Sequence, residues 1–295
     1  MTLRIGRIPY INCYPVYGAV DRGLVRLDAE LVDGVPTALN SLMASGDLDV
    51  SVVSAVEYAR DSRRYLLLPD LAISCDGPVR SVMLFSKRPA TELSGRRVLV
   101  SRSSMTSVAL LELLFENVWR AEPKFSPTDA EISDVARFHD EQHDARLVIG
   151  DAALLLDSKS RARALTSESG SAPHLEKGPP DYPYAYDLGE VWKEWTGLPF
   201  VFAVWVAQRK VAVDAALAAH AALIMSRDWG IANVPELARQ AAGSTGVPLT
   251  ACEEYLSGLD YGLSYPHLAC LTEFYRRLVE RGRVPNGTLT FLPAA

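Results

Sequence analysis

Two runs of consecutive apolar residues, SVMLFSK (81–87) and FVFAVWV (200–206), constrain the fold more than any other feature of the chain. Continuous runs of this length are typical of strands that are buried on both faces. Before the first run, short strand-like stretches such as LRIGRI and DVSVVS alternate with helical patterns such as PTALNSLMASG. A second strand–helix set lies between the two runs, and the sequence after the second run is almost wholly helical. This alternation predicts an α/β fold with parallel or mixed sheets.

The positions of the two runs predict two lobes, one built from both ends of the chain and one inserted in the middle. We place the first lobe at residues 1–86 and 204–295 and the second lobe at residues 87–203. The two runs would be crossing strands that connect the lobes as a hinge and leave a cleft between them. Because clefts at domain interfaces are favoured sites for small molecules, we expect the functional site in this cleft.

Composition and charge limit the partners of the chain. Hydrophobic residues make up 48% and charged residues 22% of the 295 residues, which is ordinary for a globular enzyme. The net charge of −6 and the lack of a dense Lys/Arg stripe argue against nucleic acid. No apolar run approaches the ~20 residues of a membrane helix, and the first residues, MTLRIGRIPY, contain no apolar core of a secretory signal. We therefore expect a cytoplasmic protein that binds a small molecule and no membrane, whereas the sequence does not indicate its oligomeric state.

The cysteine and histidine patterns do not predict a metal site. Four cysteines lie far apart without a C-x-x-C spacing, and they are expected to be free thiols in a reducing compartment: Cys13, Cys75, Cys252 and Cys270. The segment HDEQHD (139–144) has Asp where the zinc-peptidase motif has Glu, and no third ligand is evident. We expect this segment to be a solvated surface. No P-loop, G-x-G-x-x-G turn or G-x-S-x-G elbow is present either.

The segment VLVSRSSMTSVALLELLF places hydroxyl groups where a strand gives way to a helix. The strand is expected to end at Ser101, and the helix to begin near Thr106. Helix starts expose unpaired N–H groups and a partial positive charge, so anions bind there readily. A single hydroxyl would serve as the helix cap. Because Ser103, Ser104 and Ser107 surround Thr106, the segment is the clearest candidate for an anion site.

Polar residues also follow the first predicted strand, in IPYINCYPVY (8–17). A chain that only needed to turn would more often use Gly, Asp or Ser. Ligands bind at the carboxyl ends of strands in open α/β sheets. Pro9 and Tyr10 are therefore candidates for contact with a ligand, and Asn12 is either a second contact or a turn-forming residue.

Several other polar residues have a structural explanation. Ser81 stands where the chain enters the first crossing strand; a lone serine in a strand is usually structural, but this placement makes it a site candidate. Asp151 follows the strand RLVIG and most simply caps the next helix. Two pairs have the spacing of a capping box, Ser54 with Glu57 and Asp187 with Glu190.

The chain resembles a known enzyme family in five segments that keep their order and spacing. These are GRIPYINCYPVY (6–17), GVPTALNSLMASGDLDVSVVSAVEYA (34–59), DGPVRSVMLFSK (76–87), LVIGDAALL (147–155) and YDLGEVWKEWTGLPFVFAVW (186–205). They strongly resemble the chorismate dehydratases of the futalosine route to menaquinone. The segment 120–145 and the last helices match weakly. A sister family that makes 1,4-dihydroxy-6-naphthoate shares the fold, but its opening motif, S-x-C-x-N-D-T, is not matched by GRIPYINCYP.

This resemblance implies a two-lobed fold like a type II periplasmic solute-binding protein, in which each lobe is a mixed sheet flanked by helices. It implies that chorismate loses water to give 3-[(1-carboxyvinyl)oxy]benzoate without a metal or organic cofactor. The family's binding positions carry over onto Asn12 and Ser81, which we predict to be catalytic. The turn Ser103–Ser107, with Met105 in it, matches the family's carboxylate-binding helix start. Gly150 and Asp151 complete the predicted substrate contacts.

The residues that match the family contain no evident catalytic base, since no histidine lies in these motifs and the acids have the spacing of caps. A carboxylate of the substrate itself could take the proton. Two alternatives remain at this point. The chain could be a cytosolic binding or sensor protein for a small carboxylate, or the sister naphthoate synthase.

Overall fold

The structure is a computed structural model that describes residues 2–128, 142–166 and 182–293. The strands are β1 (Leu3–Arg7), β2 (Ala29–Asp33), β3 (Val50–Ser54), β4 (Tyr65–Cys75), β5 (Val82–Ser86), β6 (Arg97–Ser101), β7 (Lys124–Thr128), β8 (Ala145–Ile149), β9 (Tyr184–Asp187), β10 (Phe200–Gln208) and β11 (Leu259–Asp260). The α-helices are α1 (Tyr14–Asp21), α2 (Pro36–Ser45), α3 (Ala55–Arg60), α4 (Met105–Leu114), α5 (Gly150–Thr166), α6 (Leu188–Thr196), α7 (Val213–Ala232), α8 (Val234–Thr245), α9 (Leu249–Gly258) and α10 (Tyr265–Glu280). Short helical segments are η1 (Ile11–Cys13), η2 (Ala90–Glu92) and η3 (Phe115–Trp119). None of the helices in the described ranges combines the length and apolarity that a membrane span needs.

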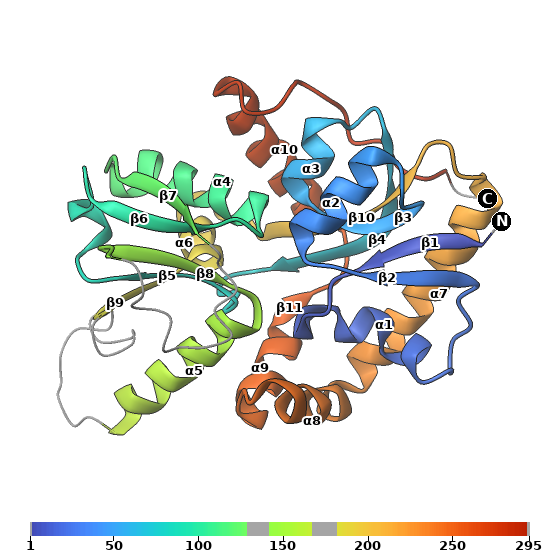
Figure 1. Cartoon of the computed structure of the whole chain (residues 1–295), viewed down its shortest axis with the longest axis horizontal. Helices are drawn as coiled ribbons and strands as arrows, with labels where there is room; N and C mark the ends of the chain where they lie inside the picture. The colour runs from blue at the N-terminus through green and yellow to red at the C-terminus, as the bar shows by residue number, and fades with distance from the viewer. Residues whose placement is uncertain (1, 129–141, 167–181, 294–295) are drawn as a thin grey trace.

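The strands form two mixed sheets that lie side by side (Figure 1). In the six-stranded sheet, of order β11-β4-β10-β3-β1-β2, β1 is parallel to β2 and β3, and β10 is antiparallel to β3 and β4. In the five-stranded sheet, of order β7-β6-β8-β5-β9, β6 is parallel to β7 and β8, and β5 is antiparallel to β8 and β9. Helices α2 and α3 cover one face of the first sheet and α1 and α7 the other, while α4 and α5 lie on opposite faces of the second. The predicted α/β fold with mixed sheets flanked by helices is confirmed.

Helix α2 shows how local sequence signals set an element. Pro36 occupies its first position, where the missing N–H costs nothing because first-turn N–H groups have no partner within the helix. Gly46 ends the helix in the left-handed region, at φ 83°, and its N–H bonds to the carbonyls of Leu42 and Met43. Glycine reaches this conformation without a Cβ clash. Both boundaries agree with the helical pattern PTALNSLMASG (36–46), which begins with this proline and ends with this glycine.

The sheet assignments move the expected lobe crossings. Among the described residues, β5 (Val82–Ser86) pairs within the second sheet alone and β10 within the first alone. The apolar runs are therefore core strands of one sheet each, rather than strands that span both. We propose that the chain crosses between lobes in the segments 76–81 and 197–199, which moves both predicted boundaries, those near residues 86 and 204, to earlier positions.

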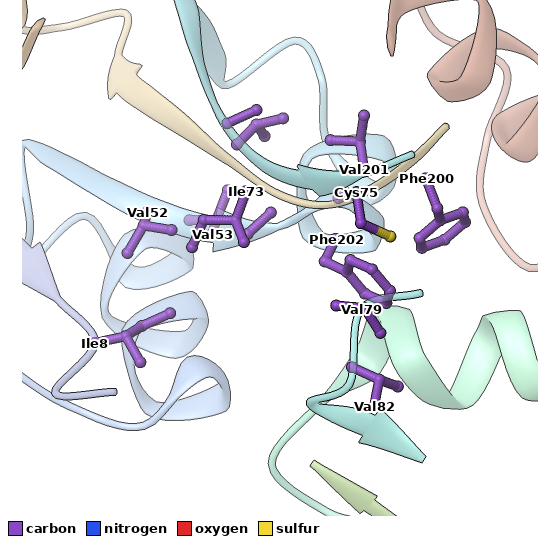
Figure 2. Packing of buried hydrophobic residues seen from close by; sticks show 14 of the residues in the cluster. Ile8, Val52, Val53, Ile73, Cys75, Val79, Val82, Phe200, Val201 and Phe202 are labelled. Atoms are coloured by element: carbon purple, nitrogen blue, oxygen red, sulfur yellow. The ribbon is translucent and has the colours of Figure 1, made fainter. Parts of the chain in front are cut away.

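One cluster of buried apolar side chains runs through both sheets, with members from β3 in the first and β6 in the second. Figure 2 shows its part around the crossings, where Phe200 and Phe202 of β10 lie beside Cys75 and Val79. All four of these side chains are buried. Because protein interiors are packed as densely as organic crystals, these contacts fix how the two sheets meet in this arrangement.

The cysteines and one histidine test two expectations from the sequence, namely free thiols and a solvated segment 139–144. All four cysteines are free, as predicted, and all four are buried. Burial raises the pKa of the Cys13 thiol to about 12, so this cysteine is not a reactive thiolate. His143 is 6% exposed, and its Nε2 lies 2.7 Å from the Tyr182 hydroxyl. The expectation of a solvated position is therefore wrong for His143, while His139 lies outside the described residues.

Candidate active site

A cavity of about 70 Å³ lies where the two sheets meet, and residues of both line it. Five helical segments begin at its wall, at the following residues: Asn12 in η1, Pro36 of α2, Ser54 before α3, Ser104 before α4 and Gly150 of α5. The amino end of a helix carries a partial positive charge and unpaired N–H groups. Helix starts that meet in this way favour an anion as ligand.

The wall of this cavity carries neutral side chains. Its other polar members are Tyr10, Ser81 and Ser107. Its apolar side chains include those of Ile8, Ile73, Val79, Val82, Ile149, Phe202 and Ala203. Of the residues described, no Asp, Glu, His, Lys, Arg or Cys lines it. A charged ligand would thus meet helix starts and neutral donors in apolar surroundings, where such interactions are stronger than in water.

A larger hollow of about 370 Å³ lies on the first lobe, with Tyr58 of α3 and Tyr275 of α10 in its wall. It contains none of the site residues that the sequence predicts, and residues of one lobe line it. Size alone does not make a binding site. We place the candidate active site in the smaller cavity because polar groups from both lobes converge there.

The start of α4 presents two hydroxyl groups to the cavity. Ser104 caps the helix, since its Oγ accepts a hydrogen bond from the Ser107 N–H at 3.2 Å. The Ser104 hydroxyl in turn donates to Ser107 Oγ at 2.8 Å. With its oxygen already accepting, the Ser107 hydroxyl can direct its own proton to a ligand in the cavity. This arrangement suits a carboxylate oxygen.

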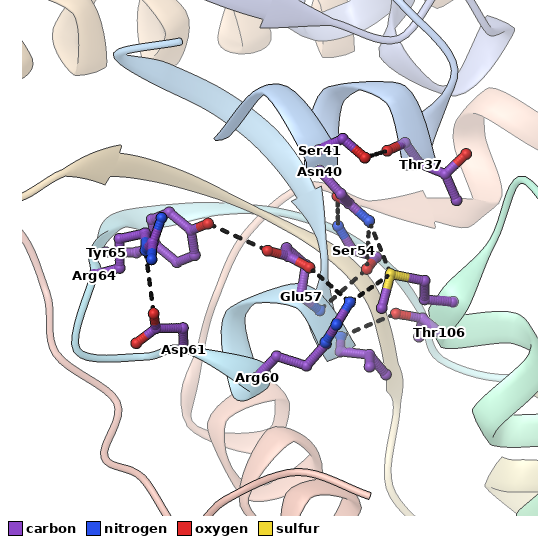
Figure 3. A network of polar contacts seen from close by, with 12 residues as sticks. Thr37, Asn40, Ser41, Ser54, Glu57, Arg60, Asp61, Arg64, Tyr65 and Thr106 are labelled. Carbon is purple, nitrogen blue, oxygen red and sulfur yellow. Dashed lines mark hydrogen bonds and ion pairs between the residues drawn. The ribbon is translucent and has the colours of Figure 1, made fainter. Parts of the chain in front are cut away.

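The start of α3 is occupied by protein groups (Figure 3). Ser54 Oγ accepts hydrogen bonds from the Glu57 N–H at 3.2 Å and from the Asn40 amide at 3.1 Å. The predicted cap is thus confirmed for Ser54. The other half of the predicted box is wrong, because the Glu57 carboxylate accepts from the Tyr65 hydroxyl at 3.2 Å instead of returning to Ser54. Burial raises the pKa of Glu57.

Asn12 brings an unsatisfied polar atom to the cavity. Its Oδ1 is buried, and within the described ranges of the chain it has no hydrogen-bond partner. Leaving a buried acceptor unpaired costs about 1–3 kcal/mol, so such atoms in folded proteins usually mark a place for water or a ligand. A ligand hydroxyl could donate to this oxygen.

Ser81 is held firmly at the start of β5. Its Oγ accepts a hydrogen bond from the Tyr255 hydroxyl at 2.8 Å. Its backbone carbonyl accepts from the Gly150 N–H at 2.8 Å, and its own N–H donates to the Val79 carbonyl at 2.7 Å. Ser81 is 4% exposed. The side chain therefore reaches the cavity in a fixed orientation.

A buried carboxylate, that of Asp187, holds the crossing segment next to Ser81. Its Oδ1 accepts from the N–H groups of Gly189 and Glu190 at the start of α6, at 2.9 and 3.2 Å. The same carboxylate accepts from the N–H groups of Val79 and Arg80, at 3.0 and 2.5 Å. Burial raises the pKa of Asp187 to about 6. The predicted cap is confirmed, and the carboxylate also anchors the crossing.

Three predicted contacts join the lobes instead of lining the cavity. Thr106 Oγ1 accepts from the Val56 N–H of α3 at 3.1 Å. Met105 Sδ accepts from the Asn40 amide at 3.4 Å. On the opposite side, Asp151 Oδ1 accepts from the Ile11 N–H at 3.2 Å. Both sides of the cavity are thereby closed by contacts between helix starts.

The structure brings together six of the predicted site residues at the cavity: Tyr10, Asn12, Ser81, Ser104, Ser107 and Gly150. It places five outside the cavity wall: Pro9, Ser103, Met105, Thr106 and Asp151. Pro9 is exposed, and the Ser103 N–H bonds to Ser101 Oγ at 2.9 Å.

The sequence does not indicate a functional position for Ser54, which lines the cavity, or for Tyr255, which contacts Ser81 behind the wall. Ser54 was visible only as a cap, although its place at the end of a strand parallel to β1 could have indicated the same sheet edge as Asn12. Tyr255 lies on α9, far along the chain from Ser81, and no local pattern indicates their contact.

The chain matches a known family along most of its length. The profile of the menaquinone biosynthesis family matches residues 3–280. A chorismate dehydratase of Thermus thermophilus is 32% identical over 273 residues, which cover 92% of this chain and 95% of that protein. A chorismate dehydratase of Campylobacter jejuni is 25% identical over 212 residues, covering 70% and 69%.

Solved structures share the fold at lower identity. Protein AF1704 from Archaeoglobus fulgidus superposes with a TM-score of 0.75 at 20% identity, covering 96% of this chain and 98% of the other. The alkanesulfonate-binding protein SsuA from Xanthomonas axonopodis pv. citri, bound to MOPS, superposes with a TM-score of 0.66 at 14% identity, covering 98% and 96%. The two-lobed fold of periplasmic binding proteins is thus confirmed for this chain.

Proposed function

Because the chain belongs to the menaquinone biosynthesis family, we propose that it is a chorismate dehydratase. It is a hydro-lyase that removes water from chorismate to give 3-[(1-carboxyvinyl)oxy]benzoate. The observation that carries this proposal is the neutral cavity at which five helical segments begin. Chorismate is a dianion with a hydroxyl and an ether on its ring, and the cavity offers positive helix ends for carboxylates and neutral polar groups for the oxygens.

The reaction needs little chemical assistance. The ring carboxylate of chorismate is conjugated to a diene, which makes the hydrogen on the ether-bearing carbon acidic. One C–H bond and one C–O bond break, and the proton and the hydroxide leave as one molecule of water. The ring becomes aromatic, which supplies a large driving force. The protein therefore has to orient the substrate and stabilise the negative charge that develops on the carboxylate.

The start of α4 is the proposed site for the ring carboxylate. Ser107 can donate its proton into the cavity, because its oxygen is already the acceptor for Ser104. The partial positive charge of this helix end stabilises negative charge as it spreads onto the carboxylate. The interaction strengthens in the transition state and so lowers the barrier rather than only binding the substrate.

Asn12 and Ser81 are the proposed catalytic residues. The unpaired Oδ1 of Asn12 would accept from the leaving hydroxyl or orient the enolpyruvyl arm. Ser81 would donate to the leaving oxygen. No ionisable acid or base lines the cavity among the described residues, so we assign proton removal to a carboxylate of the substrate itself.

The two lobes must part for substrate to enter. At about 70 Å³ the cavity is well below the ~300–1,000 Å³ of ordinary ligand sites. Closure around the substrate would exclude water while the carbanion-like species exists. Small-angle scattering with saturating chorismate should then show a protein at least as compact as the ligand-free form, and expansion would contradict closure.

We also propose a cytoplasmic location, because four free buried cysteines fit a reducing compartment.

Incubation of the purified protein with chorismate tests the function. We expect an aromatic absorbance to appear and mass spectrometry to show a product lighter than chorismate by one water. Intact chorismate at the end of the incubation, with the ligand bound, would instead indicate a binding or sensor protein. Turnover of the cyclic futalosine-derived substrate in place of chorismate would indicate the sister synthase.

Asn12→Ala tests the site. Loss of one well-placed polar group should lower kcat by about 10²–10³-fold. Ser41→Ala is the control, because this hydroxyl is exposed on α2 and donates to the Thr37 carbonyl, away from the cavity. If both variants turned over chorismate equally well, Asn12 would be removed from the mechanism.

A further inference from the structure

Tyr255 stands directly behind Ser81. It comes from α9, and its side chain is 3% exposed. Its hydroxyl donates to Ser81 Oγ at 2.8 Å, whereas Tyr255 itself is not part of the cavity wall. In the part of the chain that the structure describes, this is the one hydrogen bond to Ser81 Oγ. The phenol therefore acts on the cavity through the serine.

The direction of this hydrogen bond decides what Ser81 can do. A serine hydroxyl has one proton to donate and an oxygen that accepts. Because the Tyr255 proton lies on the acceptor side of Ser81 Oγ, the Ser81 proton is left to point at an acceptor elsewhere, and Ser81 opens onto the cavity. Burial raises the pKa of Tyr255 far above its ordinary value, so the phenol stays a neutral donor.

We propose that Tyr255 is a positioning residue whose hydroxyl orients Ser81, so that Ser81 donates its proton to the hydroxyl oxygen that leaves the substrate. This role rests on the proposed dehydration. Hydroxide is a poor leaving group, and a hydrogen bond to its oxygen stabilises the charge that develops as the C–O bond breaks. A donor that polarises Ser81 also strengthens the bond that Ser81 donates, since chained hydrogen bonds reinforce one another.

The chain offers a matched control for Tyr255. Tyr261 is 2% exposed, and within the described residues its hydroxyl is buried without a hydrogen-bond partner. It follows β11, immediately after the helix that carries Tyr255. Tyr→Phe at either position removes one buried hydroxyl and keeps the ring, so the two variants differ mainly in the bond to Ser81.

The experiment compares steady-state kinetics on chorismate for the wild type, Y255F, Y261F, S81A and the double variant S81A/Y255F. A neutral hydrogen bond contributes about 0.5–1.5 kcal/mol, so we expect Y255F to lower kcat by about 2–13-fold with KM changed by less than about two-fold. Y261F should keep wild-type kcat. In the S81A background, Y255F should have no further effect, because the hydroxyl it would orient is gone.

Two results would overturn this role for Tyr255 alone. One is that Y255F and Y261F have the same kcat and KM while the wild type is active. The other is a Y255F effect that is equally large with and without Ser81, which is what a purely structural role would give. If the wild type left chorismate intact, the proposed function would fall and the role of Tyr255 with it.

Incorporation of 3-fluorotyrosine at position 255 gives a second measurement that does not depend on Y255F folding. This residue keeps the ring and the hydroxyl and makes the phenol a stronger hydrogen-bond donor. The proposal expects kcat at or above that of the wild type, with KM unchanged. A kcat as low as that of S81A would overturn it.

Discussion

The helix starts of α3 and α4 both carry a serine cap, and they differ in what surrounds that serine. At α3, Ser54 Oγ accepts from the Glu57 N–H and the Asn40 amide, and the Ser54 N–H donates to Asn40 Oδ1 at 3.2 Å. Ser104 and Ser107 at α4 bond to each other. A cap whose partners are all protein groups stabilises the fold. Because Ser104 and Ser107 bond to each other, the Ser107 hydroxyl proton is left for a ligand.

The two starts also contact each other. The Val56 N–H of α3 is taken by Thr106 of α4 at 3.1 Å. Thus α3 gives a first-turn N–H to the other lobe, while the second residue of α4 accepts it and the serines of α4 face the cavity. The same sequence signal serves lobe docking in one case and, in the function we propose, anion binding in the other, and the tertiary neighbours decide which.

Ser107→Ala should have the largest effect of the changes that would break this comparison. Loss of the donor at the start of α4 should lower kcat by about 10²–10³-fold, because it removes a bond that strengthens as charge develops on the carboxylate. The control is Ser158→Ala on α5 of the same lobe, whose hydroxyl bonds to the Leu155 carbonyl. Equal kinetics for the two variants would mean that the pair at α4 is only a cap.

Asp187, the cap of α6, extends the comparison to a charged cap. Burial raises the pKa of its carboxyl from 3.8 to about 6, so between these values the native state binds a proton that the unfolded state has released. Stability from this group is therefore full below about pH 4 and is lost as the pH rises through about 6.

Urea unfolding of the wild type and D187N measures this linkage. The unfolding free energy of the wild type minus that of D187N should fall by about 2–3 kcal/mol from pH 4 to pH 7, since each pKa unit corresponds to about 1.4 kcal/mol. A difference that rose over the same range would show that the four N–H groups around the carboxylate outweigh its burial.

Thr106→Val tests the docking side of the comparison. The change keeps the shape of the side chain but leaves the Val56 N–H without its acceptor, which costs about 1–3 kcal/mol if the amide stays buried. Opening of the lobes would let water reach that amide, so the ligand-free variant should be more expanded in small-angle scattering. Thr272→Val, at an exposed position of α10, is the control. An equal radius of gyration for both variants would show that the Val56–Thr106 hydrogen bond does not hold the lobes closed.

Local signals predicted what local contacts decide. Pro36 and Gly46 set both ends of α2, and Ser54 and Asp187 cap their helices, because each of these effects acts within a few residues. The contact of Tyr255 with Ser81 had no such signal, since it joins positions that are distant in the sequence.

Burial and sheet membership were harder to predict for a related reason. The run 81–87 has the composition of a strand buried on both faces, and this composition is the same in either sheet. His143 stands in a polar segment, yet Tyr182 provides a partner that allows its burial. In both cases the deciding contact comes from residues far along the chain.

The smallest expected effects come from removing each of the two caps in turn, by Ser54→Ala and by Ser104→Ala. Loss of the Ser54 hydroxyl removes two hydrogen bonds inside the first lobe and leaves the Asn40 amide short of an acceptor. The unfolding free energy of this variant should therefore be about 1–2 kcal/mol below that of the wild type. Loss of Ser104 should cost about 1 kcal/mol or less, because one cap is removed from a partly exposed turn.

Turnover should follow the opposite order, because Ser104 donates to Ser107, the residue to which we assign the substrate carboxylate, whereas we assign no substrate contact to Ser54. Urea denaturation and steady-state kinetics on the same two proteins give both rankings. Opposite rankings of the two variants for stability and turnover would separate a folding cap from a ligand-binding cap. If one variant were worse in both measurements, the two helix starts would share a single role, and the division between docking and binding would have to be abandoned.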